Sequence, residues 1–182
     1  MRLFEATHVF RHDWDTVSLA SWRKYPNDKT PHVRHVEVLN QEVDPETGVL
    51  RTERLIMVKQ NVPTLLKKLF GGDMSYVLEF SEVDPRKKSM VLQSQNMTFS
   101  NVLSVGEYIL YQPDPDNRAH TQFVQSAQLK ASSALCRFAN KVEDMCWNRF
   151  KDNAHIGKLG LEQVVSTILA ERQALLMTQN IE

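Results

Sequence analysis

The sequence has little cysteine, no excess of charge of either sign and no long apolar run. Its only cysteines among 182 residues are Cys136 and Cys146, which lie in a stretch with helical periodicity. That spacing separates them by about 15 Å along a helix, which is too far for a disulfide. Two free, mostly buried thiols are therefore expected. Neither a CxxC motif nor metal-ligand spacing is present, so no metal or redox site is predicted.

Charge and hydropathy argue against two further classes of protein. The 22 Lys and Arg residues balance the 22 Asp and Glu residues. A nucleic-acid-binding surface usually needs a basic excess, so no nucleic-acid partner is expected. No apolar run is long enough to span a bilayer. The N-terminus MRLFEATHVF lacks the pattern of a signal or transit peptide, and its alternation predicts a first strand instead.

The hydrophobic periodicity predicts an α+β fold. A helix is expected over 14–25, with Asp13 as its N-cap and Pro26 ending it. From Ser132 the period becomes 3.6, which predicts a long C-terminal helix weakened at Gly157 and Gly160. Seven strands joined mostly by short polar turns indicate an antiparallel meander. The predicted strands are 2–11, 32–43, 49–59, 75–83, 89–99, 102–112 and 121–131. A curved sheet that grips a long helix tends to leave a cavity for a ligand.

Two polar residues interrupt the apolar stripe of the long helix. Arg149 and Asn153 fall in the middle of this stripe at 100° per residue. The apolar members of the stripe are Leu135, Phe138, Val142, Cys146 and Ile156. A charge that faces a sheet needs compensation. Arg149 could pair with an acidic strand residue or reach solvent, or it could face a ligand.

Three further polar residues follow the same logic. Lys24 shares a face of the early helix with Trp14, Val17, Ala20 and Ser21. Lys59 ends the strand face that carries Leu55 and Met57, and His32 begins a strand after Pro31. Each has an ordinary explanation, since the lysines could extend to solvent and His32 could be a structural histidine.

Taken together, these residues aim cations and amides at one predicted interior. Such an interior suits an anionic amphiphile, with its phosphate on Lys or Arg and its tails on the apolar lining. No Ser-His-Asp order, HExxH motif, Gly-rich phosphate loop or separate acidic pair is present, so no catalytic residue is predicted. Glu143 and Asp144 are interpreted as the solvated face of the long helix, or as one side of a protein contact.

The segment QNVPTLLKKLFGG is the last unusual feature. It sets Leu65, Leu66, Leu69 and Phe70 around Lys67 and Lys68, between Pro63 and the pair Gly71-Gly72. An amphipathic surface turn is one interpretation. A segment hinged at its ends is the other, because the glycine pair would give a hinge its backbone freedom.

Several motifs together carry a resemblance to a known family. They are KYPN at Lys24–Asn27, TERLIMVKQNVP ending at Pro63, EVDPRKKS at Glu82–Ser89, and NKVED with RFKDNAHIGKLG between Asn140 and Gly160. The sequence resembles the PRELI family of mitochondrial phospholipid-transfer proteins, most closely its slowmo-type fungal branch, over residues 1–175. The resemblance implies a START-like fold, in which a curved seven-stranded antiparallel sheet grips a long C-terminal helix around a lipid cavity. Residues 176–182 would form a tail.

The resemblance also implies roles for individual residues. Lys24, His32, Lys59, Arg149 and Asn153 would bind the lipid headgroup. The phosphatidic-acid branch carries further lysines where this chain has Val58 and Asn61. Lys59 is the nearby cation here instead, as in the slowmo-type branch. Residues 60–73 would form a lid over the cavity. Its membrane-contacting residues would be Val62, Leu65, Leu66, Lys67, Lys68, Leu69 and Phe70, with Gly71 and Gly72 as the hinge.

The implied function is transfer of an anionic phospholipid between the outer and inner mitochondrial membranes, without an enzymatic step or cofactor. Phosphatidylserine is the favoured cargo, and phosphatidic acid for cardiolipin synthesis is the alternative. The protein would reside in the intermembrane space. It would pair with a small helical protein bearing twin Cys-x9-Cys motifs, and it would touch membranes transiently. A lipid-sensing scaffold and an enzyme that uses the same cavity are the alternatives of other classes.

Overall fold

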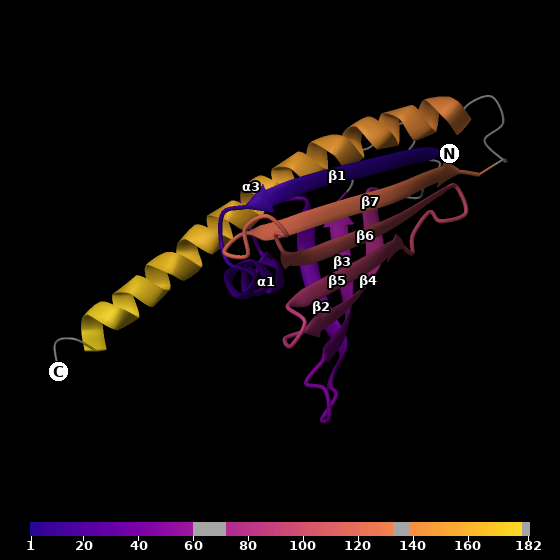
Figure 1. Ribbon diagram of the computed structural model, residues 1–182. Coiled ribbons are helices and arrows are strands. Elements are labelled where there is room, and N and C mark those ends of the chain that lie inside the picture. Colours follow the sequence, from indigo (N-terminus) through magenta and orange to yellow (C-terminus); the bar gives the residue numbers. More distant parts are fainter. Residues whose placement is uncertain (60–71, 133–138, 180–182) are drawn as a thin grey trace.

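The computed structural model describes residues 1–59, 72–132 and 139–179. Its elements in chain order are β1 (Arg2–Phe10), α1 (Trp14–Trp22), β2 (Val33–Val43), β3 (Leu50–Lys59), β4 (Met74–Asp84), β5 (Ser89–Asn96), β6 (Leu103–Pro113), β7 (Thr121–Ala131) and α3 (Ala139–Gln179). The predicted α+β class and all seven predicted strands are confirmed (Figure 1).

The seven strands form one antiparallel sheet in the order β1-β7-β6-β5-β4-β3-β2. Strands β2 to β7 follow one another as the predicted meander. Strand β1, however, pairs with the last strand, and Phe10 lies opposite Thr121. Helix α1 and the segment after it connect this edge of the sheet to β2 at the other edge. Sequence periodicity did not predict this pairing, because alternation shows that a strand exists and not which neighbour it takes.

Helix α1 begins where the sequence predicted it. The Asp13 side chain accepts a hydrogen bond from the Thr16 backbone N–H at 2.9 Å, which caps the helix N-terminus. The helix ends at Trp22, three residues before the predicted end. Tyr25 precedes Pro26, and a residue before proline disfavours the helical conformation, so the chain leaves the helix early.

Helix α3 runs beside β1 at one edge of the sheet (Figure 1). Its 41 residues correspond to about 60 Å. Trp147 donates a hydrogen bond from Nε1 to the carbonyl oxygen of Leu3 at 3.1 Å, and the rings of Phe4 and Phe150 pack edge to face with centroids 5.2 Å apart. These contacts hold the first half of the helix to β1.

The second half of α3 completes the hydrophobic core. Leu161, Val165 and Ile168 are buried against α1 and the sheet. The remaining core residues are Phe10, Trp14, Val17, Ala20, Met90, Leu92, Tyr111 and Phe123.

Beyond Ile168 the helix is exposed, and its C-terminal end projects past the sheet (Figure 1). Residues 176–179 continue the helix. No helix in the described ranges is long and apolar enough to cross a bilayer.

The expectation that Glu143 lies on the solvated face of α3 is wrong. Its side chain is buried and accepts a hydrogen bond from the Ala131 backbone N–H at 2.9 Å. Asp144 is exposed and pairs with Arg2. Glu143 therefore ties the first turns of α3 to the end of β7.

Candidate functional site

A cavity of about 340 Å³ lies between the inner face of the sheet and helix α3. A volume of this order falls within the range of ligand pockets. The floor comes from strands β3 to β7, one wall comes from α3, and one end is closed by residues at and after the end of α1. The apolar part of the lining includes Val58, Val77, Phe99, Leu103, Val105, Leu129, Val142, Met145, Cys146 and Phe150. The predicted cavity between sheet and helix is thus present.

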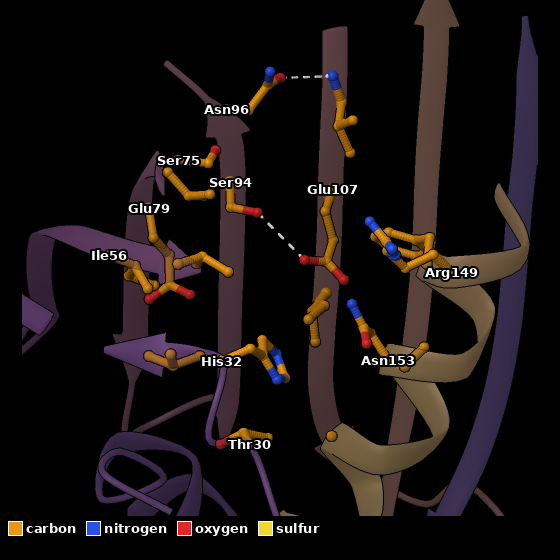
Figure 2. Close-up of a pocket in the computed structure, with 18 of the residues that line it drawn as sticks. Thr30, His32, Ile56, Ser75, Glu79, Ser94, Asn96, Glu107, Arg149 and Asn153 are labelled. Atoms are coloured by element: carbon orange, nitrogen blue, oxygen red, sulfur yellow. Dashed lines mark hydrogen bonds between the residues drawn. The ribbon is translucent and has the colours of Figure 1, made fainter. Parts of the chain in front are cut away.

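A row of polar side chains crosses the cavity floor. Antiparallel register places Arg54 on β3 opposite Glu79 on β4, Glu79 opposite Ser94 on β5, and Ser94 opposite Glu107 on β6. We call these four residues the polar row. Directly paired residues on neighbouring strands share one face of a sheet, so all four face the cavity. Figure 2 shows Glu79, Ser94 and Glu107 on neighbouring strands.

Arg54 and Glu79 form a closed ion pair within this row. Both Arg54 Nε, at 2.9 Å, and Arg54 Nη2 donate to Glu79 Oε1. The Trp22 ring lies 5.0 Å from the guanidinium carbon. Both charged residues are buried, and a buried charge is tolerated when a partner of this kind compensates it. The charges of Arg54 and Glu79 therefore neutralise each other.

Glu107 occupies a different environment. Its Oε1 accepts a hydrogen bond from Gln125 Nε2, and its Oε2 accepts one from Ser94 Oγ at 3.3 Å (Figure 2). Removal from water raises the pKa of Glu107, and the hydrogen bond from Gln125 and the charge of Lys24 only partly offset this. The carboxylate is thus held by neutral donors, with a cation nearby.

Lys24 reaches the same cavity, although it lies beyond the end of α1. Helical phase therefore does not explain its direction. Its Nζ lies 5.4 Å from the centroid of the Tyr25 ring. Desolvation alone would lower the pKa of Lys24, but Tyr25, Tyr111 and Glu107 outweigh it and raise the pKa. Lys24 consequently stays a cation in the cavity.

A helix glycine makes room for this lysine. A Cβ atom at Gly157 would lie only 3.2 Å from Lys24 Nζ. Similarly, a Cβ at Gly160 would lie 3.4 Å from the amide of Asn27, whose Nδ2 donates to the Gly160 carbonyl at 3.0 Å. The two glycines do not interrupt α3. They let the segment after α1 approach it closely.

Arg149 and Asn153 line the cavity from α3, and Figure 2 shows both projecting toward the strand that carries Glu107. His32 also lines the cavity. Burial, and then the charge of Lys24, lower the pKa of His32, so the ring is neutral at neutral pH. Four of the five predicted headgroup residues, Lys24, His32, Arg149 and Asn153, therefore line one cavity.

Lys59 does not join them, so its predicted position is wrong. The cavity-lining residues of β3 are Arg54, Ile56 and Val58, and Lys59 is exposed. Side chains alternate across a strand, which puts Lys59 with Leu55 and Met57 on the outer face of the sheet. Both faces of β3 carry aliphatic residues, so hydropathy does not distinguish the inner face from the outer one.

The predicted lid falls largely outside the described residues. Val62, Leu65, Leu66, Lys67, Lys68, Leu69, Phe70 and Gly71 lie in the range 60–71, for which nothing is described. Gly72, the second predicted hinge residue, lines the cavity. Leu135 and Phe138 of the predicted stripe, and Cys136, also lie outside the described ranges. The other thiol, Cys146, is free and half-buried, and burial raises its pKa.

Sequence reasoning missed the polar row. A detectable signal existed for two of its members, because Arg54 and Glu79 are opposite charges on consecutive predicted strands. Pairing the predicted strands as a meander would have set Arg54 against Glu79 and exposed their complementary charge. No cluster of metal-ligating side chains occurs within residues 1–59, 72–132 and 139–179.

Solved structures with this architecture define the class of fold. A protein from Thermus thermophilus aligns with a TM-score of 0.63 at 15% identity, over 92% of this chain and 99% of that one. The Zhui aromatase/cyclase from Streptomyces sp. R1128 aligns at 0.59 and 16% identity, over 95% of each chain. A START superfamily protein from Mycobacterium smegmatis aligns at 0.51 and 12% identity, over 89% of this chain and 98% of that one. The fold is START-like.

Sequence comparison then supplies the family. The PRELI-like family matches residues 15–172, and the chain belongs to it. "Protein UPS2, mitochondrial" of Saccharomyces cerevisiae is 44% identical over 167 residues, which is 91% of this chain and 73% of that protein. "Protein slowmo homolog" of Dictyostelium discoideum is 37% identical over 174 residues, 95% of this chain and 75% of that protein. The predicted family is confirmed.

Proposed function

We propose that the protein extracts single anionic phospholipid molecules from one membrane, carries them in the cavity and releases them at another. The lipid would leave chemically unchanged. The observation that carries the proposal is the division of the cavity into a charged part and an apolar part. Lys24, Arg149 and Asn153 surround the charged part, where a phosphate would bind.

The register of the sheet supports this division. Next to the polar row lies a mainly apolar row, in which Ile56 pairs with Val77, and Val105 pairs with Leu129. Beyond it, Val142 and Met145 of α3 face the same space. An amphiphile whose headgroup meets the charged part would therefore place its acyl chains on hydrocarbon, where burial is favourable.

Family membership supports a mitochondrial setting for the proposed transfer. The Saccharomyces cerevisiae relative is named a mitochondrial protein. That name supports a mitochondrial location for this chain, and we propose the intermembrane space, between the two membranes it would serve. Phosphatidylserine is the cargo we favour, because the resemblance to the slowmo-type branch implies it; one of the relatives is named a slowmo homolog.

A protein partner is part of the proposal. The outer face of the sheet exposes Tyr76, Phe80, Met97 and Tyr108, between 38% and 55% of each being accessible. Exposed aromatic and methionine side chains grouped on one face are typical of protein interfaces. A small helical protein with twin Cys-x9-Cys motifs is the partner we propose.

The experiment is phospholipid transfer between liposomes by the full chain with this partner, with fluorescent phosphatidylserine and phosphatidic acid compared in parallel. We expect transfer of both and faster transfer of phosphatidylserine. Faster transfer of phosphatidic acid would favour the alternative cargo. Binding of lipid without transfer would contradict the carrier function and favour a lipid-sensing scaffold, and a chemically altered lipid would favour an enzyme.

A further inference from the structure

The polar row carries one charge that phosphate binding does not explain. A site built only for a phosphate gains nothing from a carboxylate, because the two anions repel each other. Yet Glu107 lines the cavity on the strand toward which Arg149 and Asn153 project (Figure 2). Its hydrogen bonds come from Gln125 and Ser94, which are neutral. Two neutral donors leave lone pairs of a carboxylate available.

The charges around the cavity indicate what Glu107 would bind. The described lining residues include the cations Lys24, Arg54, Arg149 and Lys158 and the carboxylates Glu79 and Glu107. Arg54 and Glu79 neutralise each other as a closed pair. The other charged residues of this set are the cations Lys24, Arg149 and Lys158 and the carboxylate Glu107. A phosphoserine headgroup has the complementary pattern, with two anionic groups and one ammonium, whereas phosphatidic acid offers only a phosphate.

We propose that Glu107 is a specificity-determining residue that accepts hydrogen bonds from the ammonium group of the headgroup. The phosphate and carboxylate of the headgroup then face Lys24 and Arg149. Glu107 thereby favours amine-bearing anionic phospholipids over phosphatidic acid, whose phosphate it repels. Gln125 and Ser94 act as positioning residues, because they fix the carboxylate in the row. This inference rests on the proposed transfer function and names the lipid class that the site selects.

The test compares three lipids in the liposome transfer assay with the full chain and its partner. They are phosphatidylserine, N-acetylated phosphatidylserine and phosphatidic acid. N-acetylation removes the ammonium and keeps the phosphate and the carboxylate. The variant is Glu107→Gln, which preserves shape and removes the charge. The matched control is Glu53→Gln, which removes the same charge from the outer face of β3. Thermal melts of both variants check that they are folded.

For the wild type we expect phosphatidylserine transfer roughly tenfold faster than N-acetylated phosphatidylserine transfer, the effect of one hydrogen-bonded charge. Glu107→Gln should remove this difference and speed phosphatidic acid transfer, while Glu53→Gln should match the wild type. Equal wild-type rates for the two serine lipids would overturn the inference without any variant. An unchanged ratio of the phosphatidylserine rate to the N-acetylated phosphatidylserine rate in a folded Glu107→Gln protein would also overturn it. No transfer of any lipid by the wild type would overturn the proposed function, and the inference with it.

Discussion

Arg149 is the residue at which the sequence-based prediction and the structure agree most directly. Its position in an apolar helical stripe predicted an interior cation, and α3 does place it in the cavity. The Arg149→Glu variant should abolish phospholipid transfer, because it puts a like charge where the phosphate would bind. Liposome transfer measures the rate, and the melting temperature measures stability.

The control for this variant is Lys141→Glu. It reverses a charge on the same helix at an exposed position outside the cavity lining. We expect wild-type transfer from it. Normal transfer by a folded Arg149→Glu protein would rule out the proposed headgroup site.

Individual residues were only partly predictable, for a physical reason. A polar residue in an apolar helical stripe stands out, because a helix has one buried face. Strand β3 carries apolar residues on both faces, so its inner face could not be identified by hydropathy, and Lys59 was misplaced. Glu107 was missed because a single acid in an alternating strand looks like a solvated position. The hydrogen bonds that hold it come from the neighbouring strands β5 and β7, and they depend on the register of these strands, which hydropathy does not give.

At the scale of elements, the contact between α3 and the segment after α1 gives a second prediction. Gly157→Ala should stabilise α3 by up to about 1 kcal/mol through helix propensity. It should also slow transfer, because the new Cβ would displace the Lys24 ammonium, now 3.2 Å from that position. Denaturant unfolding and liposome transfer, measured on the same preparation, test both effects.

Thr167→Ala is the matched control for Gly157→Ala, since it raises helix propensity at an exposed position of α3 outside the cavity lining. Transfer by this variant should be unchanged. If Gly157→Ala transferred lipid at the wild-type rate, the close approach of Lys24 to α3 would have no functional role.

Elements were the most predictable level of this structure. Strand alternation and the Asp13 cap are local signals, and they located every strand that the structure describes and the start of α1. Helix α3 continues through Gly157 and Gly160 without a break. Glycine lowers intrinsic helix propensity, but packing against Lys24 and Asn27 overrides that preference here.

For the whole molecule, two histidines make stability depend on pH. Burial, followed by the charge of Lys158, lowers the pKa of His8, while Glu162 opposes this. Burial and then Lys24 lower the pKa of His32. As pH falls below about 6.5, the unfolded chain binds protons that the folded chain does not. These histidines therefore stabilise the fold at neutral pH, and this contribution is lost as pH falls through their folded pKa values.

Glu107 contributes a pH dependence of stability with the opposite sign, since its pKa is raised in the folded state. The measurement is therefore a difference between the wild type and a His8→Asn/His32→Asn variant in urea unfolding. We expect the free energy of unfolding of the wild type, relative to the variant, to decrease from about pH 7.5 to about pH 5.5. A constant difference over this range would show that neither ring titrates with a lowered pKa.

The pairing of β1 with β7 has a consequence for how the chain folds. Residues 2–10 cannot complete the sheet until residues 121–131 are available, and the core needs Leu161, Val165 and Ile168 as well. A nascent or partly translocated chain that ends before β7 therefore lacks the partner of its first strand. Contacts so distant in sequence slow folding. The chain can reach its native state only after nearly all of it has emerged from the ribosome or from a membrane pore.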